Sequence, residues 1–150
     1  MNTLFAFLHH VAAFMLVGSL AIEHSLIRLK LDRHVAQKLQ RADIIFGICA
    51  GIILVVGLIR VFHFEKGASY YFHSIPFMIK IALFILMGLL SIYPTIQFIS
   101  WRSHIRNNQD PVVPDHKITL IQRIIKYELA IAILMMLCAA MAARGVGVMS

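Results

Sequence analysis

The amino-acid sequence predicts an all-α polytopic membrane protein, an antiparallel bundle of four transmembrane helices with both termini outside. The 150-residue chain is 60% hydrophobic with a mean hydropathy of +0.82, whereas soluble domains are closer to half apolar. Apolar stretches near 20 residues, long enough to cross a bilayer, recur along it. Basic residues concentrate in two of the segments between them, which predicts the orientation. We find no internal repeat, and expect residues 1–150 to form a single membrane domain.

The first span is expected over residues 3–22, and a basic segment follows it. Glu23 and His24 stand at the inner end of this span. No basic residue precedes the apolar run, so the N-terminus does not resemble a signal peptide. The segment after the span has a single acid, Asp32, and five basic residues, which predict an amphipathic stretch on the membrane surface: Arg28, Lys30, Arg33, Lys38 and Arg41.

The second span is expected over residues 42–63. Asp43 falls in its first turn, where a negative charge suits the positive end of a helix. Gly47 and Gly51 have the spacing of small residues that lets membrane helices pack closely. Arg60 and His63 stand at its outer end.

The third and fourth spans are expected over residues 75–99 and 118–143. Lys80 lies about two turns inside the outer end of the third span. Pro94 lacks an amide hydrogen, so we expect it to kink this helix or nearly end it. Glu128 lies in the fourth span, only about a turn inside the inner membrane edge.

The distribution of charge predicts which loops face the cytoplasm. The first and third loops each carry five basic residues, the second set being Arg102, Arg106, Lys117, Arg123 and Lys126. The opposite side carries Arg60, Lys66 and Arg144, so the positive-inside rule places the first and third loops in the cytoplasm of a bacterial inner membrane. These basic loops are short and lie against lipid, which argues against nucleic-acid binding. We expect the bilayer itself to be the main partner.

Depth estimates at 1.5 Å per residue sort the polar side chains into two sets. An outer set comprises His9, His10, Arg60, His63, His73 and Lys80. An inner set comprises Glu23, His24, Asp43, Tyr93, Arg123, Lys126 and Glu128. Lys80 and Glu128 come out about 15 Å apart in depth, too far for a direct ion pair. Buried ionisable groups commonly mark functional sites in membrane proteins.

The adjacent histidines of the first span cannot both face one site, because neighbouring helical residues point about 100° apart. His10 shares a stripe with Ala13, Val17, Ala21 and His24, whose small residues would let a flat ligand approach. We therefore expect His10 to be the ligand and His9 to lie beside it. The spacing from His10 to His24 is similar to that in membrane cytochromes b with two haems. No second helix carries matching histidines, so at most one haem is expected.

These observations leave three functional hypotheses. The first is a b-type haem protein for electron transfer or porphyrin-linked redox chemistry, with His10 as axial ligand and Arg60 and Lys80 binding the haem carboxylates. His63 or His73 is the candidate for a second ligand, and the alternative is that this position stays open. The second is a copper or zinc site that combines His9 or His10 with His63 and His73.

The third hypothesis is a non-redox protein, either a small carrier or channel that uses Lys80 and Glu128 or a structural partner. A carrier of this size would need to be an oligomer. Structural explanations also exist for these residues: the histidines can bond helix carbonyls, and Glu128 can pair with Arg123, Lys126 or Tyr127. Cys49 and Cys138 lie at different depths, so no disulfide is expected. No nucleotide-binding loop or serine triad is present.

Nearly the whole chain resembles a bacterial family of membrane proteins of unknown function. The matching segments are Leu8-His9-His10, Arg41-Ala42-Asp43, Arg60-Val61-Phe62 with Phe64-Glu65-Lys66-Gly67, Ser91-Ile92-Tyr93-Pro94-Thr95, and Glu128-Leu129 with Ala142-Ala143-Arg144-Gly145. This resemblance implies the fold and brings no established activity.

More distantly, the layout is similar to HemJ-type protoporphyrinogen oxidases and CopD-like membrane proteins. The HemJ pattern has a histidine near the start of the first helix, a lysine in the third and a glutamate in the fourth, and His9 or His10, Lys80 and Glu128 occupy similar places. The rest of the HemJ first-helix signature, with its tryptophan and glycine, is not matched, because this chain reads Phe14-Met15-Leu16-Val17-Gly18 there. The resemblance therefore implies haem binding, with a haem-dependent oxidoreductase activity as one form of it.

Overall fold

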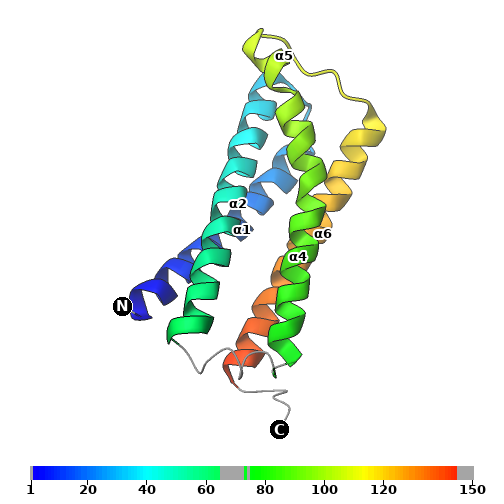
Figure 1. Ribbon diagram of the computed structural model, residues 1–150. Helices are drawn as coiled ribbons and strands as arrows, with labels where there is room; N and C mark the ends of the chain where they lie inside the picture. The colour runs from blue at the N-terminus through cyan, green and yellow to red at the C-terminus, as the bar shows by residue number, and fades with distance from the viewer. Residues whose placement is uncertain (1, 65–72, 74, 145–150) are drawn as a thin grey trace.

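The computed structural model describes residues 2–64, 73 and 75–144, and it is helical throughout its long elements (Figure 1). Residues 65–67 and Gly145, which are among the segments that resemble the membrane protein family, lie outside the described residues. The elements are α1 (Asn2–Leu26), α2 (Arg33–Ile59), a π-helical turn η1 (Arg60–Phe64), α4 (Ile75–Ser100), the short α5 (Arg102–Arg106) and α6 (Asp115–Ala143). Four helices are long and apolar enough to cross a membrane: Thr3–Leu26, Arg33–His63, Ile75–Arg106 and Asp115–Ala143. The prediction of an all-α protein with four spans is confirmed.

The four long helices form a ring in chain order. α1 packs against α2, α2 against α4, α4 against α6, and α6 closes the ring against α1. Figure 1 shows α1 beside α2 and α4 beside α6, each pair antiparallel. The closest packing is within these two pairs, so the molecule is an up-and-down bundle built from two helical hairpins.

α2 begins at Arg33, well before the apolar run at residue 42. Asp32 caps the helix, since its carboxylate accepts a 2.7 Å hydrogen bond from the backbone N–H of Val35. Ala36 and Leu39 in the added turns are both 0% exposed. The basic segment after the first span is therefore largely the inner end of α2, and it is stabilised by tertiary burial.

Most buried apolar side chains of the described residues lie in two separate clusters. All four long helices contribute to the outer one, whereas α2, α4 and α6 contribute to the inner one together with Ile27, which lies one residue beyond α1. The outer cluster consists of Ala12, Leu16, Leu20, Phe46, Cys49, Met87, Ile131 and Ala132. The inner cluster consists of Ile27, Ala36, Leu39, Phe98, Trp101, Ile121 and Ile125. Large apolar side chains elsewhere point outward, among them Phe14, Ile48, Leu89 and Ile133, as expected for surfaces that meet lipid.

One local expectation about helix packing needs correction, whereas the extent of α4 and the state of the cysteines agree with expectation. Gly47 and Gly51 are exposed, and a Cβ added at either would meet nothing within 4 Å, so neither makes a close helix contact among the described residues. α4 continues past Pro94 to Ser100. Cys49 and Cys138 are both free, as expected.

Candidate functional site

Three carboxyl groups lie in the polar layer between the two apolar clusters. Glu23 of α1 is 2% exposed, Asp43 of α2 is 9% exposed and Glu128 of α6 is 1% exposed. We call these three residues the carboxyl layer. Along the chain each acid stands between a residue of the outer cluster and one of the inner cluster, in the series Leu20–Glu23–Ile27, Phe46–Asp43–Leu39 and Ile131–Glu128–Ile125.

The members of the carboxyl layer act electrostatically on one another. Glu23 interacts with both Asp43 and Glu128, and Glu128 also interacts with Asp43. The remaining long helix, α4, contributes Thr95, whose hydroxyl donates a 2.7 Å hydrogen bond to Oδ1 of Asp43. All four long helices therefore bring a polar group to this level of the bundle.

Two carboxyl oxygens in the layer lack a hydrogen-bond partner. Oε1 of Glu23 and Oε1 of Glu128 are buried, and neither bonds to any group in the described part of the chain. The basic neighbours proposed for Glu128, Arg123 and Lys126, are exposed, as is Tyr127. Pairing with those three residues therefore does not account for the burial of Glu128, because consecutive helical positions diverge around the axis.

The sequence suggested that Asp43 lies in the first turn of its helix, but the structure places it further along. α2 begins at Arg33, so Asp43 lies in the third turn and points into the bundle toward Thr95. Its acid is therefore part of a buried polar contact and does not compensate a helix end. His24, at the inner end of α1, is half-buried, and its Nδ1 has no hydrogen-bond partner among the described residues.

A second polar site lies at the outer end of the bundle, around His9. The imidazole of His9 is half-buried and faces α2 at Gly57, where an added Cβ would lie 3.6 Å from its Cε1. It interacts electrostatically with Lys80 of α4 and Arg60 of η1, which are both half-buried. Nδ1 of His9 is buried and has no hydrogen-bond partner among the residues that the structure describes. We call His9, Arg60 and Lys80 the outer site.

The expectation that His10 faces the interior is wrong. His10 is exposed, and its Nδ1 lies 2.6 Å from the carbonyl oxygen of Ala6 on its own helix. The two imidazole rings are 6.1 Å apart and inclined at 79°. α1 turns inward along the stripe that contains His9, Ala12, Leu16 and Glu23, because the buried apolar residues and the acid share that face. His10 thus bonds a helix carbonyl, which was the structural alternative for these histidines.

The other outer histidines are at the surface. His63 of η1 and His73, just before α4, are both exposed. Within the described residues, no group of three or more His, Cys, Asp or Glu side chains could hold a metal ion. The copper or zinc hypothesis, including a site formed by His10 and His63, gains no support from this arrangement.

Lys80 and Glu128 belong to different sites. Lys80 interacts with His9 at the outer end, whereas Glu128 interacts with Asp43 toward the inner end. Along α4 and α6 the outer-cluster residues Met87 and Ile131 lie between them. The bundle therefore has a cationic polar site on one side of an apolar cluster and an acidic one on the other.

Comparison with known proteins identifies a family for the chain but no activity. No curated protein and no solved structure matches it. The more distant resemblance to HemJ-type and CopD-like proteins therefore gains no support from these comparisons. One family model, described as a predicted membrane protein, matches residues 1–147, nearly the entire sequence. The chain belongs to DUF2214, a family of predicted membrane proteins.

Proposed function

We propose that the outer site binds b-type haem through His9, and that the protein serves electron transfer or porphyrin-linked redox chemistry in a bacterial inner membrane. One observation carries the proposal. His9 turns inward to a helix position that has no side chain, Gly57, and its Nδ1 has no partner among the described residues. Burying an imidazole nitrogen without a partner is costly in a membrane, so a ligand for it is favoured.

The chemistry of the surrounding residues fits this cofactor class. Neutral imidazole is a common ligand of haem iron. The two haem carboxylates need cationic partners, and Arg60 and Lys80 are the cations that interact with His9. Haem b, when bound, supplies one-electron iron chemistry. His9 would hold the iron, and Arg60 and Lys80 would orient the ring by its carboxylates.

The HemJ resemblance favours the same assignment. The HemJ pattern has a histidine in the first helix and a lysine in the third, and His9 and Lys80 are electrostatic neighbours in this chain. His63 and His73 remain the candidates for a second axial ligand. An electron-transfer role requires a redox partner, which would be another protein or a second copy of this chain.

The visible spectrum of the protein tests the haem proposal. The protein is purified in mild detergent from haem-replete cells, and spectra are recorded oxidised and after dithionite reduction. We expect a Soret band that is lost in His9→Ala and retained in His10→Ala, a matched control that removes the neighbouring, outward-facing imidazole. A colourless wild-type preparation contradicts the proposal. Retention in His9→Ala with loss in His10→Ala contradicts the assignment of the ligand.

The carboxyl layer favours a second candidate function, a carrier or channel for protons. Glu23 and Glu128 are almost completely buried, and each has an unpartnered oxygen. Their electrostatic neighbours are further carboxyls. Carboxyl groups that share a low-dielectric site share protons, so this layer can hold and pass on protons.

Reconstituted liposomes with an internal pH-sensitive dye test the second candidate. An imposed pH gradient should decay faster with the wild-type protein than in protein-free liposomes. Glu128→Gln should return the decay to the protein-free rate, because an amide cannot release a proton. Lys126→Gln is the control, since Lys126 is exposed on the same helix. Decay at the protein-free rate with the wild-type protein rules this function out.

A further inference from the structure

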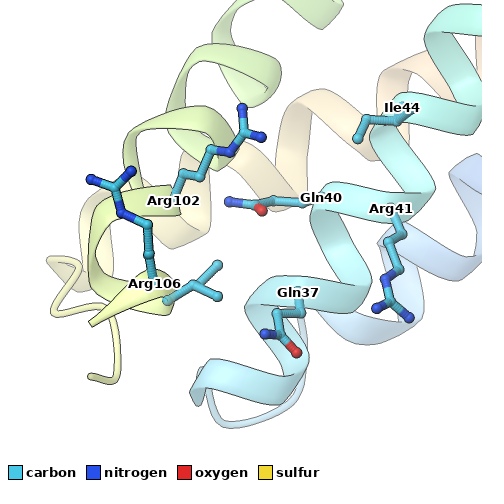
Figure 2. A pocket seen from close by; sticks show the side chains of 7 residues that line it. Gln37, Gln40, Arg41, Ile44, Arg102 and Arg106 are labelled. Carbon is cyan, nitrogen blue, oxygen red and sulfur yellow. The ribbon is translucent and has the colours of Figure 1, made fainter. Parts of the chain in front are cut away.

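A groove lined by arginine side chains lies at the inner end of the bundle, between α2 and α5 (Figure 2). Its volume is about 300 Å³. The lining residues are Gln37, Gln40, Arg41, Ile44, Arg102, Ile105 and Arg106. The set contains three positive charges, two amides and two isoleucines, and no carboxylate. The groove is on the side that the positive-inside rule places in the cytoplasm, away from both polar sites described above.

The two arginines of α5 form one wall of this groove. Arg102 and Arg106 are four residues apart on α5, a spacing that puts them on the same face of the helix. Figure 2 shows Gln40 of α2 reaching toward Arg102, whereas Arg106 turns its guanidinium group away from Gln40 and Arg41 points away from both arginines of α5. Like charges at this spacing repel one another unless an anion lies between them. The two guanidinium groups therefore favour an anionic ligand with several oxygen acceptors, such as a phosphate.

α2 changes from polar to apolar along the face that leads out of the groove. Gln37 and Arg41 are followed by Ile44 and Ile48, which are 59% and 58% exposed. A ligand with a phosphate in the groove can thus continue along an exposed apolar surface. A water-soluble phosphate has no apolar part to contact this surface, whereas the acyl chains of a phospholipid can pack against it.

Gln40 lines the groove from α2 and also contacts α4. Its Nε2 donates a 2.5 Å hydrogen bond to the carbonyl oxygen of Phe98 on α4. This bond satisfies a backbone acceptor near the end of α4 and anchors the side chain across the α2–α4 boundary. Gln37 leaves its amide available from the same helix, so the wall opposite the arginines is polar without being charged.

We propose that this groove is a binding site for an anionic phospholipid of the cytoplasmic leaflet. Arg102 and Arg106 bind the phosphate group, and the acyl chains lie along Ile44 and Ile48. Basic pockets between membrane helices on this side of a bilayer are suited to anionic headgroups. The site does not depend on the haem or proton proposals, because it shares no residue with the outer site or the carboxyl layer.

The test measures lipids that remain bound to the protein in detergent. Native mass spectrometry is performed on the wild-type protein with added phosphatidylglycerol or phosphatidylcholine, and thermal unfolding is followed with either lipid or inorganic phosphate. We expect retention of phosphatidylglycerol over phosphatidylcholine, and stabilisation by phosphatidylglycerol only. The double variant Arg102→Gln/Arg106→Gln should retain about tenfold less phosphatidylglycerol than the control Arg28→Gln/Arg123→Gln. The control removes the same charge from exposed positions outside the groove.

Three results would overturn the proposal. Equal loss in the two double variants would mean that overall charge, and not the groove, attracts the lipid. Equal retention of the two lipids would remove the role of the arginines. Stabilisation by inorganic phosphate alone would identify a free anion as the ligand. The single variant Arg106→Gln, with helicity checked by circular dichroism, keeps the test valid where the double variant fails to fold.

Discussion

The hydroxyl of Thr95 donates a 2.7 Å hydrogen bond to Oδ1 of Asp43, and this bond joins α4 to α2 at the level of the carboxyl layer. Asp43 is 9% exposed, so water is a poor substitute for the hydroxyl. Thr95 is thus a neutral hydrogen-bond donor to one of the three buried carboxyl groups. The two other carboxyl groups of the layer, Glu23 and Glu128, each keep an oxygen without such a donor.

Removal of this hydroxyl should destabilise the bundle. Thr95→Val keeps the shape of the side chain but leaves the Asp43 oxygen unpaired, which costs about 1–3 kcal/mol for a buried polar group. Thermal unfolding in detergent, followed by circular dichroism, should show a lower midpoint. Thr95→Ser retains the donor and should unfold close to the wild type. Equal midpoints for the valine and serine variants would show that the bond contributes nothing.

Gly57 controls the space beside His9. An alanine Cβ there would make an ordinary 3.6 Å contact with His9 Cε1, so Gly57→Ala should be tolerated. Gly57→Leu fills the position and should displace the imidazole, abolishing any Soret band. Gly51→Leu is the matched control on the same helix, since nothing lies within 4 Å of an added Cβ there. Loss of the band in Gly51→Leu as well would mean that His9 is not held against Gly57.

The four-span fold could be predicted because the apolar runs are long and the charges between them are segregated. The inner helix ends could not be predicted from hydropathy. α2 and α6 begin at Arg33 and Asp115, in polar sequence, and continue as helices because Asp32 caps one of them and residues such as Leu39 and Ile121 bury against the inner cluster. That burial depends on partners far away in the sequence.

The sequence predicts which residues group into the outer candidate site, but not which of their side chains point into the bundle. The grouping of His9, Arg60 and Lys80 follows from depth alone, whereas the choice between His9 and His10 depends on which face of α1 meets protein and which meets lipid. Apolar residues occupy both faces, with Phe14 70% exposed and Leu16 buried at 2%. Glu23 was the available signal, because a carboxyl group on the His9 stripe disfavours a lipid-facing orientation.

Trp101 offers a test of packing at the inner end. The Trp101 side chain is only 4% exposed, and its ring centroid lies 5.3 Å from that of Phe98. Trp101→Ala should therefore lower the free energy of unfolding by about 3–5 kcal/mol. Ile99→Ala, at a position that is 60% exposed, is expected to have little effect. Chemical unfolding in mixed micelles measures both, and similar small effects would place Trp101 at the lipid surface.

Two aspartates support the start of α2, and each can be removed separately. Asp32 accepts a 2.7 Å hydrogen bond from the backbone N–H of Val35, and Asp110, from the segment before α6, accepts one of 2.8 Å from the backbone N–H of Arg33. Both satisfy N–H groups that a helix cannot pair internally.

Asp32→Ala should cost about 1 kcal/mol, the usual value for a helix cap, and should speed amide hydrogen exchange at residues 33–36. Asp110→Ala should speed exchange at Arg33 and leave Val35 protected, because the two carboxylates bind different N–H groups. Asp115→Ala, with its side chain in the first turn of α6, serves as the control. Unchanged exchange at Val35 in Asp32→Ala would show that burial of Ala36 and Leu39 alone holds this end of the helix.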